Sequence, residues 1–169
     1  MEPQDGPRRI LRFALRNRPD TVIDGRAVGA ADGMTTLYTA PTNPTIATTS
    51  TEWVHRASEL PGWNNYPFTA TTSVEQVRLD RLIEEYGMPR FVKIDVEGSE
   101  ADVLAGLSVP LSSLSFEFLP ADRDVTFHCL LRLETLAAGV GGVYRYNFSL
   151  GEELRLVMPD TWWTVDELQ

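Results

Sequence analysis

The chain has 169 residues, of which 43% are hydrophobic and 23% are charged, and this composition fits one soluble globular domain spanning residues 1–169. Its 15 basic and 24 acidic residues give a net charge of −9, so we expect it to bind neither nucleic acid nor anionic membranes. One cysteine, Cys129, excludes an internal disulfide. With no membrane-spanning run and no hydrophobic signal core, a cytoplasmic protein is expected.

The first half of the chain predicts short elements around a long polar stretch. Arginines and apolar residues are interleaved over Arg8–Arg18, a pattern typical of an amphipathic helix. Two strands are expected next, at Thr21–Val28 and Thr35–Thr39. Residues 40–67 contain four prolines and predict one short helix at Glu52–Leu60. Loops of this length are often functional.

The second half alternates strands and helices. Its expected helices are Leu79–Tyr86, Ser99–Leu107 and Asp124–Ala138. Its expected strands are Ser73–Val77, Phe91–Val96 and Leu114–Leu119, followed by a C-terminal antiparallel pair at Val143–Phe148 and Leu154–Met158. This order is typical of βαβ units, so the sequence predicts an α/β fold with a mainly parallel sheet and helices on both faces.

The segment Phe91–Glu100 carries the strongest chemical signal. A buried strand delivers two acids, Asp95 and Glu97, at its carboxyl end, where open parallel sheets bind their ligands. A spacing of two places both carboxylates on one face if the strand continues that far. There they could accept a proton from a hydroxyl group or hold a divalent cation.

The same acids also have a structural interpretation. Ser99 and Asp102 have the spacing of a helix-capping box, and acids near the start of a helix stabilise its dipole. Gly98 fits a tight turn from strand to helix. Lys93 is more typical of a side chain that pairs with an acid than of a nucleophile. The residues alone leave the catalytic and the structural interpretation open.

Several motifs, taken in order, resemble one family. Lys93–Glu100 (KIDVEGSE), Val103–Leu107 (VLAGL) and Leu114–Phe118 (LSFEF) resemble the C-terminal core of the FkbM family of S-adenosylmethionine-dependent methyltransferases. Further segments similar to that family are Ala27–Ala30, Thr36–Tyr38, Pro41–Thr45, Ser73–Asp80 and Tyr146–Glu152. The ordered series covers almost the whole chain.

The resemblance implies a Rossmann-like class I fold that transfers a methyl group from S-adenosylmethionine to a hydroxyl of a sugar or polyketide-type molecule. It makes Glu2 the ligand of the cofactor ribose. The residues it places near the adenine are Arg26, Ala27, Val28 and Gly29. It places the turn after Phe91–Val96 at the methyl-transfer centre, where Asp95 or Glu97 would accept the hydroxyl proton. Lys93 joins them as a catalytic candidate.

The substrate side is expected in the proline-rich stretch, and its candidates are Asn43, Thr45, Trp53 and His55. Each has an ordinary alternative, because polar loops, packed tryptophans and surface histidines are common without a ligand. We expect no resident metal. If a divalent cation takes part, the oxygen ligands to test are Asp95, Glu97 and Glu117.

Two parts of the family pattern have no counterpart, the first strand and the glycine-rich loop for the methionine part of the cofactor. Neither Gly25, Gly29 and Gly33 nor Gly139–Gly142 has the spacing or context of such a loop. We therefore expect an incomplete, N-terminally truncated fold whose Phe91–Val96 strand has an open edge, through which copies could associate. The alternative function is a non-catalytic remnant that binds a partner or a glycan.

Overall fold

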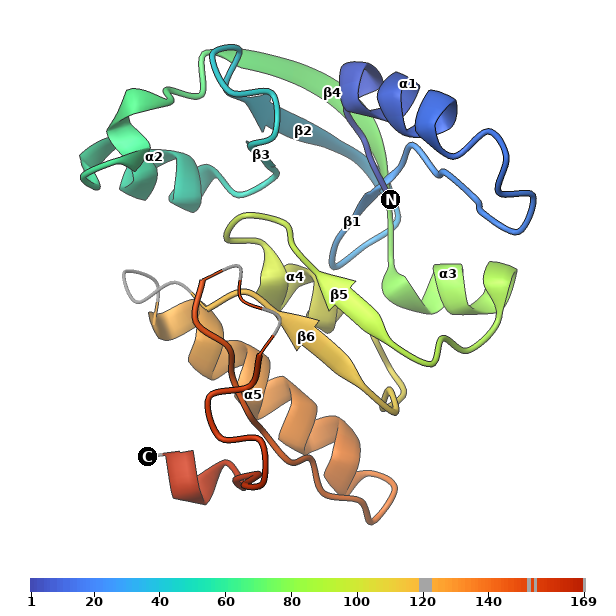
Figure 1. The fold of residues 1–169 in the computed structure, drawn as a ribbon, viewed down its shortest axis with the longest axis vertical. Helices are drawn as coiled ribbons and strands as arrows, with labels where there is room; N and C mark the ends of the chain where they lie inside the picture. Colours follow the sequence, from blue (N-terminus) through green and yellow to red (C-terminus); the bar gives the residue numbers. More distant parts are fainter. Residues whose placement is uncertain (119–122, 152, 154, 169) are drawn as a thin grey trace.

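The protein is seen in a computed structural model that describes residues 1–118, 123–151, 153 and 155–168. Its strands form two separate sheets, a four-stranded one ordered β1-β4-β2-β3 and a two-stranded one, β5-β6 (Figure 1). The strands are β1 (Ala27–Val28), β2 (Gly33–Thr39), β3 (Ala47–Thr48), β4 (Ala70–Val77), β5 (Val92–Ile94) and β6 (Leu114–Phe116). Together with the helices around them, they confirm the α/β class.

The strand directions are mixed, so the expectation of a mainly parallel sheet is wrong. β4 runs parallel to β1 but antiparallel to β2, and β2 is antiparallel to β3. The cause is the short connection at residues 29–32, because a parallel crossover needs about a dozen residues or more. The chain therefore reverses direction between β1 and β2, and only β5 and β6 form a wholly parallel sheet.

The helices lie close to their expected positions. They are α1 (Asp5–Ala14), α2 (Thr51–Glu59), α3 (Leu79–Tyr86), α4 (Glu100–Ala105) and α5 (Arg123–Ala138), with short 3₁₀ turns η1 (Trp63–Asn65) and η3 (Asp166–Leu168). Ser50 starts α2, because its hydroxyl oxygen accepts a 3.0 Å hydrogen bond from the Trp53 amide. Gly87 ends α3 with φ of 88°, a conformation that glycine reaches without steric cost.

The strand expected at Thr21–Val28 is reduced to the two residues of β1. Asp24 accepts hydrogen bonds from both the amide and the guanidinium of Arg26, and pairing with β4 begins only after these residues, at Ala27. The expected C-terminal strand pair is also wrong among the described residues. Tyr146 bridges Trp163 instead, and Leu154 lies outside the described residues, as does Leu119 at the end of the strand expected after Leu114.

The larger core lies between the β5–β6 sheet and helices α3, α4 and α5. Its buried residues are Val77, Leu79, Leu82, Ile94, Val103, Leu104, Leu107, Leu111, Cys129, Leu133 and Leu136. A smaller cluster in the four-stranded sheet contains Ala27, Leu37 and Val74. The two parts meet where Gly106, at the end of α4, packs on Gly29, since a Cβ at Gly106 would lie 2.3 Å from the Gly29 carbonyl oxygen.

Two further features of the described residues concern partners. None of their helices is both long and apolar enough to span a bilayer. β5 pairs with β6 on one side, and its other edge pairs with no strand that the structure describes. Association of copies through that edge stays a prediction.

Candidate functional site

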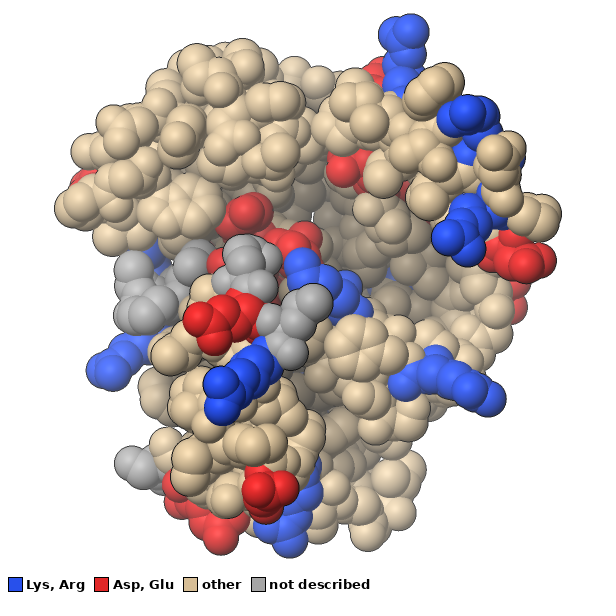
Figure 2. Space-filling view, viewed as in Figure 1, with Lys and Arg blue, Asp and Glu red and all other residues tan. Residues whose placement is uncertain are grey.

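Three carboxylates meet at the carboxyl ends of β5 and β6. The parallel register sets Ile94 opposite Phe116, so the residues that follow them, Asp95 and Glu117, leave the sheet side by side. Carboxylate oxygens of Asp95, Glu97 and Glu117, here called the carboxylate cluster, all lie within 4.8 Å of one another. Figure 2 shows acidic side chains gathered beside a hollow in the middle of the molecule. The strands thus place acids where the sequence predicts them.

Glu97 lies in a tight turn that a second element holds in place. Its φ is 51°, the one positive value that the structure describes outside glycine, and Gly98 follows with φ of 85°. These two left-handed residues turn the chain from β5 into α4. The Thr48 hydroxyl of β3 donates a 2.7 Å hydrogen bond to the Glu97 carbonyl oxygen. The turn is therefore braced by the four-stranded sheet.

The Glu97 carboxyl group is half-buried and incompletely hydrogen-bonded. Its Oε2 atom is buried and has no hydrogen-bond partner among the described residues. Burial, as the largest cause, together with the negative charges of Glu117, Asp95 and Glu100 raises the pKa of Glu97 to about 7. A carboxyl group with this pKa can both accept and release a proton near neutral pH.

Asp95 and Lys93 lie on the solvent side of the same turn. The Lys93 ammonium forms an ion pair with the Asp95 carboxylate, and both side chains are largely exposed. Exposed pairs of this kind contribute little to stability. Their importance here is to place one positive charge beside three acids, and Lys93 acts on the pKa of Glu97 in the lowering direction.

The start of α4 tests one part of the structural interpretation, the capping box. Ser99 makes no capping hydrogen bond, so the expected capping box is wrong, and its hydroxyl lies 3.0 Å from that of Thr49 instead. Glu100, 3% exposed, accepts hydrogen bonds from the amides of Val96 and Gly98 at 3.4 and 3.3 Å. Because Glu100 supports the helix start, that task does not require the carboxylate of Glu97.

Trp53 closes the turn from the side of α2. It is 1% exposed, and a Cβ at Gly98 would lie 2.8 Å from its Cβ and Cγ atoms. Its ring meets Trp63 edge to face, with the ring centroids 4.9 Å apart. The buried Trp53 side chain thus packs against Gly98, next to Glu97, and its contact with a substrate stays a prediction.

The other substrate candidates have local partners. The Asn43 side-chain oxygen accepts hydrogen bonds from the Thr45 hydroxyl at 2.7 Å and from its amide at 3.3 Å. His55 lies on the exposed side of α2. No hydrogen bond or ion pair described by the structure joins these three residues to the carboxylate cluster, so their role also stays a prediction.

Glu2, the candidate ribose ligand, lies at the start of α1. Its Oε1 atom accepts a 2.9 Å hydrogen bond from the Gln4 amide. Its own amide donates to the Asp24 carbonyl oxygen at 2.9 Å, which holds the chain start beside β1. This bond uses one of the several acceptor sites of the carboxylate, and contact with a ribose stays a prediction.

The four adenine candidates surround β1. Arg26 forms 2.6 Å ion pairs with Asp24 and Glu85, so its guanidinium is engaged on both sides. Ala27 and Val28 form β1 itself, where Ala27 is buried. Gly29 then donates to the Val77 carbonyl oxygen at 3.1 Å. The structure brings these residues together, and their contact with a cofactor stays untested.

The residues that support the turn around Glu97 were not predicted from the sequence. Thr48 and Thr49 lie in the polar stretch, and nothing in their local pattern links them to Glu97 or Ser99, about 50 residues later. Glu100 appeared only as part of the strand-to-helix motif. No local signal distinguishes the buried Glu100 from Asp102, the exposed acid in the same first turn of α4.

Comparison with known proteins gives one match. A family model described as the methyltransferase FkbM domain matches residues 7–143, a range that contains every strand and the carboxylate cluster. Glu2 lies just before the matched range. No curated protein and no solved structure matches the chain.

Proposed function

Because the chain belongs to the FkbM methyltransferase family, we propose that it transfers a methyl group from S-adenosylmethionine to a hydroxyl oxygen of a sugar or polyketide-type small molecule. The observation that carries the proposal is the half-buried carboxyl group of Glu97, with one buried, unpartnered oxygen and a pKa of about 7. A Rossmann-like class I arrangement and a cytoplasmic location belong to the same proposal.

The chemistry of the residues fits such a cofactor. Its sulfonium and ammonium groups are positively charged, and the carboxylate cluster is an acidic surface at the carboxyl end of parallel strands. A cation there would offset the mutual repulsion of the acids. When bound, the cofactor supplies a methyl group that is already activated, so the protein needs chiefly to position the hydroxyl and remove its proton.

Glu97 is the proton acceptor in this proposal. Its carboxylate would take the hydroxyl proton as the hydroxyl oxygen forms its bond to the methyl carbon. The bond from that carbon to the cofactor sulfur would break at the same time, and its electron pair would leave with the neutral thioether. A base whose pKa lies near the working pH is the most effective choice. Asp95 is the weaker candidate because Lys93 already pairs with it. Thr48 and Glu100 act as positioning residues that fix the turn.

The remaining assignments are part of the proposal. Glu2 would bind the ribose through its carboxylate, and the β1 segment with Gly29 would line the adenine side. Asn43, Thr45 and His55 would face the acceptor. The acceptor is expected to be small and neutral or cationic, since an anion would be repelled by the carboxylate cluster.

Titration calorimetry and a methyl-transfer assay test the proposal together. The full chain is titrated with S-adenosylmethionine, and transfer of a radiolabelled methyl group is measured over a panel of sugars and polyketides, with and without EDTA. We expect micromolar binding and a loss of at least about a hundredfold in transfer for Glu97→Gln. Glu59→Gln, at an exposed position at the end of α2, is the matched control and should keep full activity.

Two results would contradict this proposal. No heat at millimolar cofactor would favour the non-catalytic remnant that binds a partner or glycan. Transfer that is unchanged in Glu97→Gln would remove the proposed base while keeping the family activity. EDTA reports separately on a divalent cation, because Asp95, Glu97 and Glu117 offer the hard oxygen ligands that Mg²⁺ and Ca²⁺ prefer.

A further inference from the structure

The chain carries its positive charge unevenly. Residues 5–18 hold five of its 15 basic residues and one acid, Asp5, a net charge of +4, so the rest of the chain carries −13. These residues form α1 and the segment after it, at the margin of the molecule (Figure 1). Basic side chains gather over this margin in the surface view (Figure 2). The local charge thus has the opposite sign to that of the whole chain.

α1 packs on its own chain through its polar side. Arg8 donates hydrogen bonds to the carbonyl oxygens of Glu2, Pro3 and Gly25 at 3.2–3.3 Å, and its side chain is only 17% exposed. At 100° per residue, Arg8 lies about 160° around the helix from Ile10. Docking through Arg8 therefore turns the apolar side of α1 outward.

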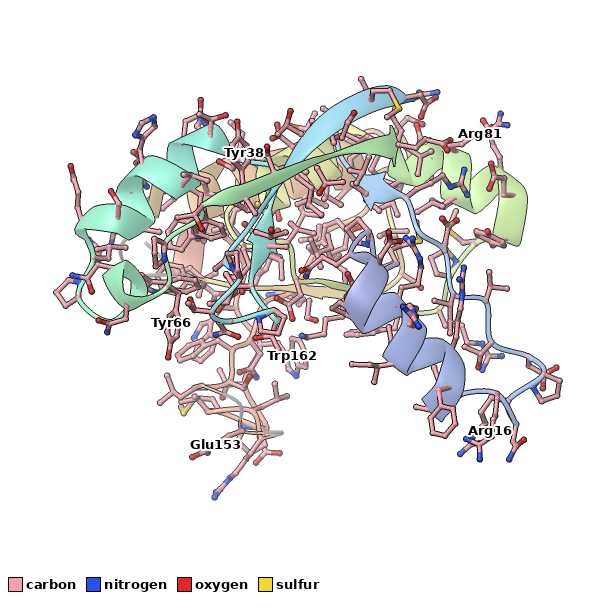
Figure 3. The ribbon with its side chains drawn as sticks, turned by 90° about the horizontal axis from the view of Figure 1, so that it is seen from above. Arg16, Tyr38, Tyr66, Arg81, Glu153 and Trp162 are labelled. Carbon is pink, nitrogen blue, oxygen red and sulfur yellow. The ribbon has the colours of Figure 1, made fainter. Side chains whose placement is uncertain are left out.

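The outward side of α1 is apolar and uncovered. Ile10 and Phe13 are 69% and 70% exposed, and α1 has no buried residue. Gly6, Arg9, Ile10 and Phe13 line a shallow surface depression there. The Arg16 guanidinium lies 4.4 Å from the centroid of the Phe13 ring, and Figure 3 shows Arg16 at the periphery, beyond the end of α1. Exposed apolar patches of this kind mark interaction surfaces.

We propose that α1 binds an anionic lipid surface, with Ile10 and Phe13 inserted among the lipids and Arg9, Arg12 and Arg16 at the level of the headgroup phosphates. All three arginines are exposed. An apolar face flanked by cationic side chains is the pattern of an interfacial helix, which lies on a membrane without crossing it. The negative net charge of the whole chain does not prevent such binding, because salt screens charges that lie more than about 8–10 Å apart.

Two other occupants fit α1 less well. A second copy docked face to face would bring the arginines of both helices together. The face, about 15 Å long and 10 Å wide, is also far below the roughly 800 Å² per partner of a stable interface. Nucleic acid could contact the exposed arginines, but it would leave Ile10 and Phe13, which share the outward face with Arg9, without an apolar partner.

Vesicle co-sedimentation of the full chain tests the proposal. We expect binding to an equimolar mixture of phosphatidylcholine and phosphatidylserine, little binding to phosphatidylcholine alone, and weaker binding at high salt. The variant I10Q/F13Q should reduce binding at least about tenfold. R9Q/R12Q should reduce it about fivefold per charge at low salt. Both pairs of sites are exposed, so circular dichroism should show folded proteins.

Matched controls come from exposed positions elsewhere. Leu131→Gln, 66% exposed on α5, and Arg90→Gln, exposed before β5, should leave vesicle binding unchanged. The proposal is overturned if anionic vesicles do not bind the chain, or if the I10Q/F13Q variant binds them as tightly as the wild-type chain does. It is also overturned if sedimentation velocity without lipid shows a dimer that I10Q/F13Q abolishes, or if polyglutamate binds as tightly as the vesicles.

Discussion

The hydroxyl of Thr48 donates a 2.7 Å hydrogen bond to the carbonyl oxygen of Glu97, which joins β3 of one sheet to the turn that follows β5 of the other. Thr48 is 1% exposed, and its hydroxyl oxygen also accepts a 3.0 Å bond from the Ser50 amide. One side chain therefore fixes both the proposed base and the start of α2.

Thr48→Val keeps the shape of the side chain but leaves the Glu97 carbonyl oxygen and the Ser50 amide without this partner. Because both groups are at least half-buried, we expect a loss of about 1–3 kcal/mol in the free energy of unfolding. Urea denaturation measures it. Thr36→Val, at an exposed position of β2, is the matched control and should change stability by less than about 0.5 kcal/mol. Equal losses in the two variants would show that the bond contributes nothing.

Glu97 makes stability depend on pH in an unusual direction. Its pKa is raised from 4.5 to about 7 in the folded chain, so the folded state holds the proton more tightly than the unfolded state. Stability from this group is therefore highest below about pH 4.5 and falls as the pH rises to 7. Glu97→Gln removes this effect and should stabilise the protein above pH 7 by on the order of 2 kcal/mol.

Urea denaturation in metal-free buffer between pH 5 and 8 checks the Glu97 prediction. The original chain should lose stability over this range relative to Glu97→Gln, whereas Glu59→Gln should follow the original. Curves for Glu97→Gln and the original that stay parallel would mean that Glu97 ionises normally. If Glu97→Gln both stabilises the chain and abolishes methyl transfer, the ionised Glu97 carboxylate lowers stability in return for activity.

Elements that depend on local sequence signals lie where they are predicted. α3 has the expected bounds because its apolar residues recur at helical spacing and Gly87 follows them. Asp95 and Glu97 lie after a strand, as expected, because the apolar strand before them and the helix after them both have clear sequence patterns. These features depend on residues within about ten positions of one another, so one sequence contains the information.

Features that depend on residues far apart in the sequence were not predicted. Strand neighbours and directions depend on pairing between distant segments, and β4 lies between β1 and β2 although it comes some 30 residues after β2. The bond from Thr48 to Glu97 spans 49 residues. The role of Glu100 depends on burial beneath the turn, and its acidic side chain would ordinarily predict exposure.

Gly98 is held to glycine by two separate constraints that can be distinguished. Its φ of 85° disfavours any other residue, and an added Cβ would lie 2.8 Å from Trp53. Gly141 also has a positive φ, 70°, but opens onto free space. Gly141→Ala should therefore cost about 1–2 kcal/mol from backbone strain alone, and Gly98→Ala should cost clearly more. Thermal denaturation of both variants measures the difference, and equal shifts in Tm would show that Trp53 gives way without cost.

Asp24 should show the opposite pH dependence to Glu97. Hydrogen bonds from Arg26 are the main cause that lowers the pKa of Asp24 from 3.8 to about 2, and Tyr86 adds a further bond. A lowered pKa contributes stability that is complete above pH 4 and is lost as the pH falls toward 2. Asp24→Asn should therefore cost about 2 kcal/mol at pH 7 and almost nothing at pH 2.

The matched control for Asp24 is Asp20→Asn, at an exposed position just before the same segment. It should leave the unfolding free energy unchanged at both pH values, since exposed acids without a close partner contribute little. Arg26 keeps Glu85 as its second partner in Asp24→Asn, so the variant should still fold. A loss of the same size at pH 2 and pH 7 would contradict the ion pair as the cause and would leave local turn geometry as the contribution of Asp24.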